Sequence, residues 1–219
     1  MNSLEIQLRR GVAELGLALT DVQVQHLLTY QSLIEKWTQV YNLTALHDPF
    51  EILTHHLLDS LAAIVPLQHQ LVHAGHDPNT LRLLDAGSGA GLPGVVIAIC
   101  CPDITVDCVD SVGKKAAFIQ QVAVTLKLGN LVGLHARVES LTNRYQVITS
   151  RAFASLLDFR NSTNEALAGH GIWMAMKGKH PTDEIAELPG CINVFHIEPL
   201  HVPGLRAERC LVWMKPWYS

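Results

Sequence analysis

Residues 83–94, with the sequence LLDAGSGAGLPG, constrain the fold of this chain more than any other segment. An apolar run ends at Asp85, passes through glycines at alternating positions and enters a second apolar stretch. Because glycine has no Cβ, its backbone can turn sharply and lie directly against a ligand. A strand, a glycine-rich turn and a helix in this order are typical of the unit that begins a parallel α/β sheet. We therefore expect a sheet whose first strand ends at this loop.

The rest of the chain continues the alternation of strands and helices. Short apolar or β-branched runs predict strands at 81–86, 104–109, 131–136, 147–150 and 172–176, with helical patterns between them. This alternation predicts a mostly parallel, twisted sheet with helices on both faces, which is a Rossmann-like α/β fold. Two later runs, 192–197 and 210–214, have no helical segment between them and predict a C-terminal antiparallel hairpin.

The first third of the chain predicts helices. Residues 20–23 fit a capping box, and apolar residues then recur at helical spacing as far as Tyr41. Asp48 followed by Pro49 signals a second helix start. We expect an N-terminal helical cap over 1–67, a polar linker over 68–80 and the sheet domain over 81–219, packed as one compact unit.

Composition excludes several classes of protein. Hydrophobic residues make up 48% and charged residues 16% of the 219-residue chain, which is typical of a compact globule and not of a disordered chain. The opening MNSLEIQLRR is too charged for a signal peptide, and no apolar run reaches the length of a membrane span. The five cysteines include no CxxC pair, which indicates a reducing compartment, and we expect a cytoplasmic protein.

The glycine loop is compatible with two classes of ligand. From Gly89 onward it satisfies GxGxxG, the pattern of a dinucleotide site, in which a pyrophosphate lies at the helix N-terminus. The carboxylate of Asp85, just ahead of the first glycine, would repel that pyrophosphate. S-Adenosylmethionine carries a sulfonium and an ammonium cation and no phosphate, so an acidic strand end favours this methyl donor.

Asp110 supports the same ligand. It follows the next predicted strand, at about the spacing expected of a carboxylate that binds ribose hydroxyls. The alternative is that Asp110, followed by Ser111, is the N-cap of the helix predicted over 112–126. The two roles are compatible.

Four motifs occur in a characteristic order: DAGSGAGLPG from residue 85, VDSVGKKAAFIQQV from 109, RVESL from 137 and ITSRAFASL from 148. They closely resemble the bacterial 16S ribosomal RNA guanine N7-methyltransferase family, also called glucose-inhibited division protein B. The resemblance extends upstream through YNLT at 41–44 and HLLDS at 56–60, and downstream to Lys177 and Gly178. It therefore covers nearly the whole chain.

The resemblance implies that 81–219 is a methyltransferase domain. It also implies that the chain transfers a methyl group from S-adenosylmethionine to N7 of one guanine in 16S rRNA, leaving S-adenosylhomocysteine and 7-methylguanosine. The donor-binding residues would be Gly87, Gly89, Leu92, Asp110, Val138, Glu139 and Arg151. The chain departs from the family at Ala86, Ser88 and Lys115, which are small changes, and in an aromatic tail over 212–219.

Methylation at N7 suits a chain in which we find no acid–base dyad. Guanine N7 carries an in-plane lone pair and no proton, so positioning can supply a large share of the rate enhancement, about 7–11 kcal/mol in well-oriented systems. We assign no catalytic residue, and Arg151 is the best candidate contributor. Residues 150–153, SRAF, lack the [DNS]PP[YFW] motif of exocyclic-amine methylation, and no cysteine lies in a loop of the site as pyrimidine-carbon methylation requires.

Cations near the same sheet edge would contact the RNA. A net charge of −4 argues against a broad nucleic-acid-binding face, so a local patch is required. We expect this patch to include Lys114, Lys115, Lys177 and His56; for each lysine the alternative is a solvated surface charge. No metal site is predicted, because His55 and Asp59 lack a third ligand.

Three functional hypotheses follow. The leading one is a monomeric 16S rRNA methyltransferase that acts on free rRNA, on the 30S subunit or on an assembly intermediate, a choice that the sequence leaves open. A dinucleotide-dependent oxidoreductase would instead use the loop from Gly89 to Gly94. A donor-binding or ribosome-associated module would bind S-adenosylhomocysteine without turnover.

Overall fold

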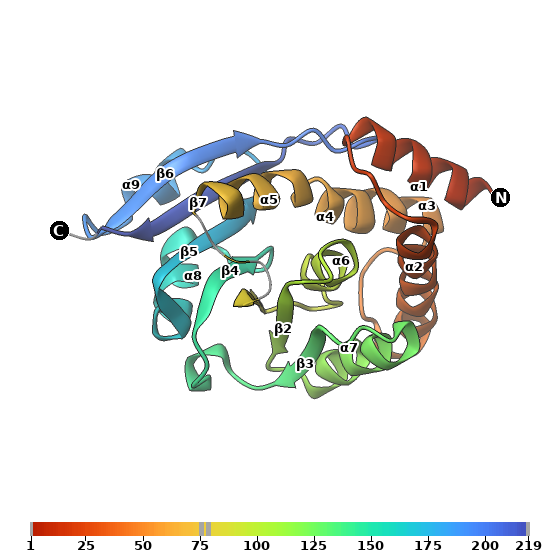
Figure 1. The fold of residues 1–219 in the computed structure, drawn as a ribbon, viewed down its shortest axis with the longest axis horizontal. Helices are drawn as coiled ribbons and strands as arrows, with labels where there is room; N and C mark the ends of the chain where they lie inside the picture. The colour runs from red at the N-terminus through yellow and green to blue at the C-terminus, as the bar shows by residue number, and fades with distance from the viewer. Residues whose placement is uncertain (1, 75–76, 78–79, 218–219) are drawn as a thin grey trace.

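The computed structural model describes residues 2–74, 77 and 80–217, and a seven-stranded sheet runs through them. Its strands are β1 (Arg82–Ala86), β2 (Thr105–Asp110), β3 (Leu131–His135), β4 (Tyr145–Ser150), β5 (Leu167–Lys177), β6 (Ile192–Pro199) and β7 (Cys210–Pro216). Their spatial order is β3-β2-β1-β4-β5-β7-β6 (Figure 1). Strands β1 to β5 are parallel, and β7 is antiparallel to both β5 and β6. The predicted parallel sheet and C-terminal hairpin are confirmed.

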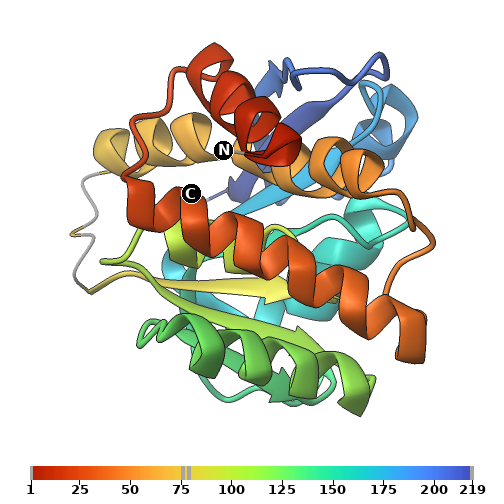
Figure 2. The ribbon, with the colours of Figure 1, turned by 90° about the vertical axis from the view of Figure 1, so that its right-hand side faces the viewer.

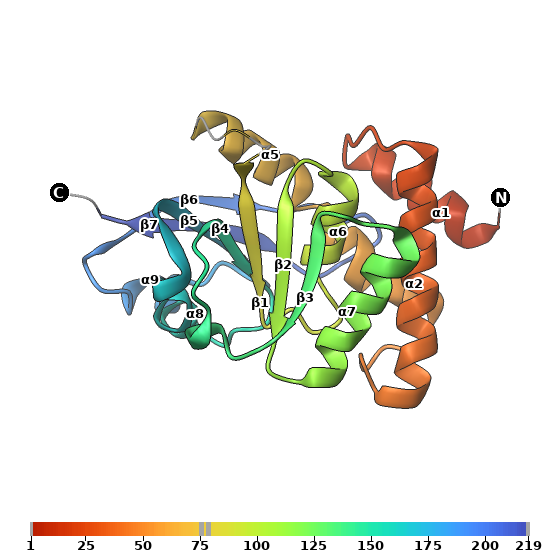
Figure 3. The same cartoon turned by 60° about the horizontal axis from the view of Figure 1, so that its bottom comes forward.

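Helices cover both faces of the sheet, as predicted. They are α6 (Gly94–Cys100), α7 (Gly113–Leu126), α8 (Leu156–Thr163) and α9 (Thr182–Ala186). In Figure 3, α6 and α7 lie on one side of the strands, and α8 and α9 on the other. Successive strand side chains point to opposite faces, so Leu83 joins the apolar cluster beneath α6 and α7 while Leu84 joins the cluster beneath α8. Both side chains are fully buried, and the sheet is held between two cores.

The N-terminal segment is helical. Its elements are α1 (Ser3–Glu14), α2 (Asp21–Tyr41), α3 (Pro49–Ile52), the π-helical turn η1 (Leu53–Leu58), α4 (Asp59–Leu61) and α5 (Ile64–His73). Thr20 caps α2, because its hydroxyl accepts the Gln23 amide while the Gln23 side chain accepts the Thr20 amide. Asp48 caps α3 by accepting the amides of Phe50 and Glu51. Both predicted helix starts are confirmed.

Helix α2 joins the N-terminal helices to the sheet domain. It crosses the outer side of α7, as the orange-red and green helices of Figure 2 show. Tyr30 stacks on Phe118 of α7 with ring centroids 6.3 Å apart, and Trp37 meets the same ring edge-on at 5.3 Å. The apolar cluster on this face is continuous from α1 to α7. The N-terminal helices and the sheet therefore share a core.

Helix α5 extends beyond the boundary predicted at residue 67. It ends at His73, so the segment 68–73 of the predicted linker is helical. Leu67 and Leu71 lie one turn apart and are both buried, which keeps this part of the helix packed on the core. Residues 75, 76, 78 and 79 of the predicted linker lie outside the described residues, as do residues 218 and 219 of the aromatic tail. The division into cap, linker and sheet domain stays a prediction.

One helical stretch, Pro49–His73, is long and apolar enough to cross a membrane by length and composition alone. This finding corrects the expectation that no segment reaches that length. The most apolar window of the stretch is 72% buried inside the fold, as is usual for a core helix.

Candidate functional site

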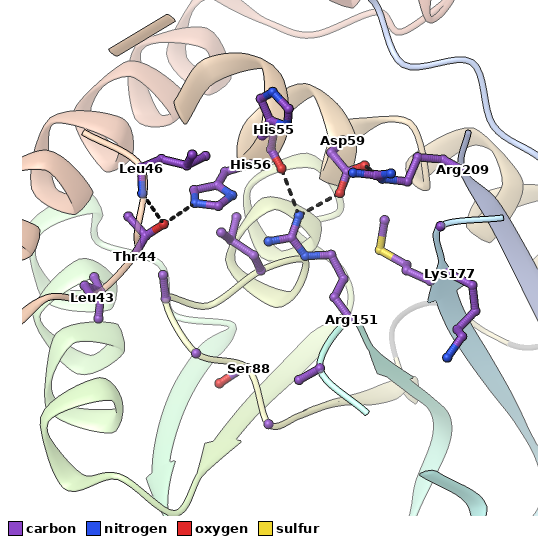
Figure 4. Close-up of a pocket in the computed structure, with 17 residues that line it drawn as sticks. Leu43, Thr44, Leu46, His55, His56, Asp59, Ser88, Arg151, Lys177 and Arg209 are labelled. Atoms are coloured by element: carbon purple, nitrogen blue, oxygen red, sulfur yellow. Dashed lines mark hydrogen bonds and ion pairs between the residues drawn. The ribbon is translucent and has the colours of Figure 1, made fainter. Parts of the chain in front are cut away.

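The carboxyl ends of β1, β2 and β4 meet where the strand order reverses. In doubly wound sheets this switch point is where ligands bind. Two cavities open there, and both are lined by Gly87 and Ala152. The first cavity, of about 570 Å³, lies between the glycine loop and the N-terminal helices (Figure 4). The second, of about 430 Å³, lies between the end of β2 and the segment after β3. Both volumes are in the usual range for small-ligand sites.

The loop after β1 takes the conformation that its glycines allow. Gly87 and Gly89 have φ angles of +66° and +60°, in the left-handed region that residues with a Cβ rarely occupy. The loop is held from α2, because the buried Tyr30 hydroxyl donates to the Ala90 carbonyl at 2.6 Å. Leu92, at the far end of the loop and also expected to bind the donor, lines the first cavity.

Asp85 lies beneath the loop and lines neither cavity, which corrects the expectation that its carboxylate faces a bound cation. Its Oδ2 accepts the Gly94 amide at 2.8 Å, at the start of α6. Burial raises the pKa of Asp85 from 3.8 to about 7, because desolvation outweighs the Gly94 hydrogen bond and the field of Arg151. The carboxylate nevertheless occupies the helix N-terminus that a dinucleotide's pyrophosphate would need, so the loop still disfavours a dinucleotide.

Asp110 ends β2 and lines the second cavity. Its Oδ2 accepts the Gly89 amide at 3.0 Å and lies 3.5 Å from the Lys115 ammonium, while its Oδ1 accepts the Val112 amide at 2.9 Å. The alternative role as a helix cap is wrong, because Val112 is itself the N-cap of α7. A carboxylate offers about four acceptor positions. Asp110 therefore has capacity for ligand hydroxyls while it ties the glycine loop to β2.

The second cavity is closed by the segment that follows β3. Val138 and Glu139, both expected to bind the donor, lie in the 3-10 turn η3 (Val138–Ser140) and line this cavity. Phe153 also lines it and packs on Phe159, with ring centroids 5.3 Å apart. An apolar wall beside two carboxylates, those of Asp110 and Glu139, suits a flat aromatic base joined to a hydroxylated sugar.

Arg151, one of the residues expected to bind the donor, follows β4 and lines the first cavity. Its Nη1 donates to Asp59 Oδ2 at 2.7 Å and to the His55 carbonyl at 3.2 Å (Figure 4). Asp59 Oδ1 accepts in turn from Nε of Arg209 at 2.7 Å. Sequence reasoning missed this arrangement, because Arg209 lies 150 residues from Asp59 and stands in no motif. For Asp59 the available signal was the HLLDS motif.

His55 and Asp59, the pair considered from the sequence as possible metal ligands, instead hold the Arg151 side chain. The His55 carbonyl and the Asp59 carboxylate both accept hydrogen bonds from Arg151. Across residues 2–74, 77 and 80–217, no group of three or more histidine, cysteine, aspartate or glutamate residues could hold a metal ion.

His56 lines the first cavity from η1 and is uncharged at neutral pH. Its Nε2 lies 2.7 Å from the Thr44 hydroxyl, which also accepts the Leu46 amide at 3.2 Å. Burial, with a smaller contribution from the Arg151 charge, lowers the pKa of His56 from 6.5 to about 4. His56 therefore presents a neutral ring to the cavity.

The lysines predicted at the substrate differ in their surroundings. Lys115 lines the second cavity and Lys177 the first, whereas Lys114 lines neither. The Lys177 ammonium lies 2.9 Å from a Glu184 carboxylate oxygen. The Lys114 ammonium lies 5.2 Å from the centre of the Tyr41 ring, in a cation–π contact. Each of these lysines thus has a protein partner that an RNA phosphate would have to compete with.

Comparisons with known sequences agree with this geometry. The family model described as rRNA small subunit methyltransferase G matches residues 23–212. A relative named ribosomal RNA small subunit methyltransferase G, from Albidiferax ferrireducens, is 63% identical over 220 residues, which cover 98% of each chain. A second relative of that name, from a Polaromonas species, is 62% identical over 98% of this chain and 95% of its own.

Solved structures share the fold at low sequence identity. Ribosomal protein L11 methylase from Lactobacillus delbrueckii subsp. bulgaricus matches with a TM-score of 0.56 at 12% identity, over 73% of this chain and 79% of that one. TrmN from Thermus thermophilus matches with a TM-score of 0.55 at 17% identity, over 75% of this chain and 53% of that one. These matches confirm the predicted fold class.

Proposed function

The chain belongs to the rRNA small subunit methyltransferase G family, and from this premise we propose that it transfers a methyl group from S-adenosylmethionine to N7 of a guanine in 16S ribosomal RNA. It is an enzyme whose cofactor is S-adenosylmethionine and whose substrate is small-subunit rRNA. The observation that supports this placement best is that Asp110 and Arg151, at the carboxyl ends of the two strands that flank β1, line two cavities that share Gly87.

The side chains of both cavities fit this donor, which supplies an electrophilic methyl group on a sulfonium sulfur. The residues that we propose to hold it are Gly87, Gly89, Leu92, Asp110, Val138, Glu139 and Arg151. The carboxylates of Asp110 and Glu139 would accept ribose hydroxyls in the second cavity. In the first cavity, the Arg151 guanidinium suits the carboxylate of the amino acid portion.

We place the target guanine in the outer part of the first cavity, which Thr44 and His56 line from the N-terminal helices. The residues proposed to contact the RNA are Lys114, Lys115, Lys177 and His56. The neutral His56 ring would meet a base, whereas the lysines would meet phosphates. Binding would require Lys177 to exchange its Glu184 partner for a phosphate oxygen.

The first cavity is built for positioning and not for proton removal. Among the described residues that line it, Asp59 is the one carboxylate, and both of its oxygens accept hydrogen bonds from arginines. Guanine N7 has no proton to lose, so no base is needed. Alignment of the lone pair with the methyl group can supply about 7–11 kcal/mol in well-oriented systems.

We further propose that the protein acts as a cytoplasmic monomer on rRNA presented by the 30S subunit or by an assembly intermediate. The net charge of −4 provides little attraction for naked RNA, so a folded particle would have to present the guanine. Light scattering measures the molar mass in solution and so tests whether the protein is a monomer. Parallel reactions with naked 16S rRNA and with undermethylated 30S subunits test the substrate. Equal rates on both would contradict the proposal that a folded particle must present the guanine.

The main test uses a labelled methyl donor with undermethylated 30S subunits and with 16S rRNA, followed by nuclease digestion and identification of the labelled nucleoside. We expect label in 7-methylguanosine, with strong loss in Asp110→Ala and Arg151→Ala. The matched controls Asp103→Ala and Arg206→Ala remove the same side chains from exposed positions outside both cavities and should retain activity. No label at a guanine N7 in either substrate would refute the assignment.

Calorimetry separates the remaining hypotheses. S-Adenosylhomocysteine should bind, and NADH should not. Binding of NADH alone would favour an oxidoreductase. Binding of S-adenosylhomocysteine without turnover on either RNA substrate would favour a module without catalysis.

A further inference from the structure

Three segments that are distant in the sequence converge on the Asp59 carboxylate. Asp59 begins α4, Arg151 follows β4, and Arg209 immediately precedes β7. One carboxylate oxygen accepts from Arg151 and the other from Arg209, each at 2.7 Å. The Asp59 side chain is 4% exposed, so this charge is removed from solvent and needs both partners. Figure 4 shows the carboxylate between the two guanidinium groups at the wall of the first cavity.

The two hydrogen bonds set the orientation of the Asp59 carboxylate. If one oxygen were unpaired, the group could rotate about its last torsion and offer either oxygen to Arg151. With Arg209 bound to Oδ1, only Oδ2 faces Arg151. The His55 carbonyl, 3.2 Å from the same Nη1, adds a second acceptor. One nitrogen of Arg151 is therefore held from two directions.

The rest of the Arg151 guanidinium is available to a ligand. Within the described part of the chain, its Nε and Nη2 have no hydrogen-bond partner, and its side chain is 21% exposed. Two arginines and one aspartate leave the cluster with a net positive charge. That charge faces the cavity in which the carboxylate of the methyl donor was placed above.

We propose that Asp59 and Arg209 are positioning residues that orient Arg151 toward the methyl donor. This inference rests on the donor site assigned above. Arg209 acts through Asp59, so the conformation just before β7 is coupled to the affinity for the donor. Since Arg209 also lines the first cavity, a direct contact with RNA is the competing role that the test must separate.

The test is a mutant cycle in the full-length protein. Arg209→Gln, Arg151→Gln and the double variant are compared for S-adenosylhomocysteine affinity by calorimetry and for the kcat and rRNA KM of methyl transfer. We expect Arg209→Gln to weaken the affinity about tenfold, because Asp59 Oδ1 would lose its charged partner and the carboxylate could reorient relative to Arg151. Arg151→Gln should weaken it at least as much. The double variant should match Arg151→Gln, because residues that act in one chain of contacts are not additive.

Two further variants separate positioning from a structural or charge effect. Arg206→Gln removes an exposed cation from the same loop and should leave donor affinity unchanged. Arg209→Lys keeps a positive charge near Asp59 and serves as the alternative variant if Arg209→Gln fails to fold. Its affinity for S-adenosylhomocysteine should lie between those of the wild type and Arg209→Gln.

Any of three other outcomes would overturn the inference. Additive losses in the double variant would show that Arg209 acts independently of Arg151. A raised rRNA KM with unchanged donor affinity in Arg209→Gln would assign the residue to the RNA. If Arg151→Gln itself leaves donor affinity unchanged, the positioning role fails, while labelling of guanine N7 by the wild type still decides the proposed function separately.

Discussion

The hydrogen bond from Tyr30 to the glycine loop offers a sharp test of how the N-terminal helices support the site. The Tyr30 hydroxyl is fully buried and donates to the Ala90 carbonyl at 2.6 Å, with the Gly91 carbonyl as a longer second acceptor at 3.3 Å, so α2 holds the loop through this group. Tyr30→Phe removes this one oxygen and leaves the ring packed on Phe118. We expect the variant to lose both stability and donor affinity.

The loss can be estimated from the burial of both partners. The hydrogen bond contributes about 1 kcal/mol net, and an unsatisfied buried carbonyl costs about 1–3 kcal/mol. Because Ala90 is 7% exposed, water can partly replace the hydroxyl, and we expect a loss of about 2 kcal/mol in the free energy of unfolding. For a chain of this size that lowers Tm by about 4–8 °C. If about 1 kcal/mol of this held the loop in its binding conformation, the Kd for S-adenosylhomocysteine would rise about fivefold.

Tyr145→Phe is the matched control. The Tyr145 hydroxyl is also on a fully buried residue and donates to Asp107 at 2.8 Å, but neither residue lines a cavity of the site. This variant should lose at least as much stability, because its acceptor is a carboxylate, and should retain donor affinity. Scanning calorimetry and titration calorimetry measure the two quantities. Equal donor affinities for the two variants would refute the idea that Tyr30 organises the loop.

Three other substitutions probe the loop and its surroundings. Asp110→Asn should raise the Kd for S-adenosylhomocysteine at least about tenfold in titration calorimetry. The substitution replaces one acceptor oxygen with an NH₂ donor, which would then face either a backbone N–H or a ligand hydroxyl that needs an acceptor. An unchanged Kd would contradict the proposed role of Asp110 in binding the ribose. For His56, the pKa lies near 4 in the folded state and 6.5 when unfolded, so the unfolded state binds more protons between these values and stability is lost as pH falls. Between about pH 7 and about pH 5 the wild type should lose about 2 kcal/mol relative to His56→Gln in urea unfolding, and parallel pH profiles would be inconsistent with a buried neutral ring. Gly94→Ala should cost about 1–3 kcal/mol, because the new methyl group would collide with the Cys108 sulfur, whereas at Gly129 a Cβ meets no atom within 4 Å; equal Tm values for the two alanine variants would rule out this crowding.

Local patterns predicted the strands and the helix starts well. Alternating apolar runs predicted the strands, and the capping sequences at Thr20 and Asp48 predicted helix starts, because these signals depend on neighbours along the chain. Gly87, Asp110 and Arg151 could be placed at one sheet edge because the carboxyl ends of parallel strands converge. Their roles in donor binding remain proposals.

The direction of a side chain was harder to predict. The sequence places Asp85 at the end of a strand, but strand alternation turns it toward α6 and away from both cavities. His56 could be expected near the RNA, yet its neutral state follows from the burial of its ring in the folded chain. Neither property has a signal in the adjacent residues.

The amino-acid order alone therefore determined the order of the elements, the glycine turn and the carboxylate that ends β2, since backbone preference and apolar periodicity act over a few residues. The tertiary structure decided which charges meet. Arg151, Asp59 and Arg209 come from segments 92 and 150 residues apart and are joined only when β4, α4 and the start of β7 pack together. Electrostatic pairing depends on distance in space and on removal of water, and packing, not sequence separation, sets both.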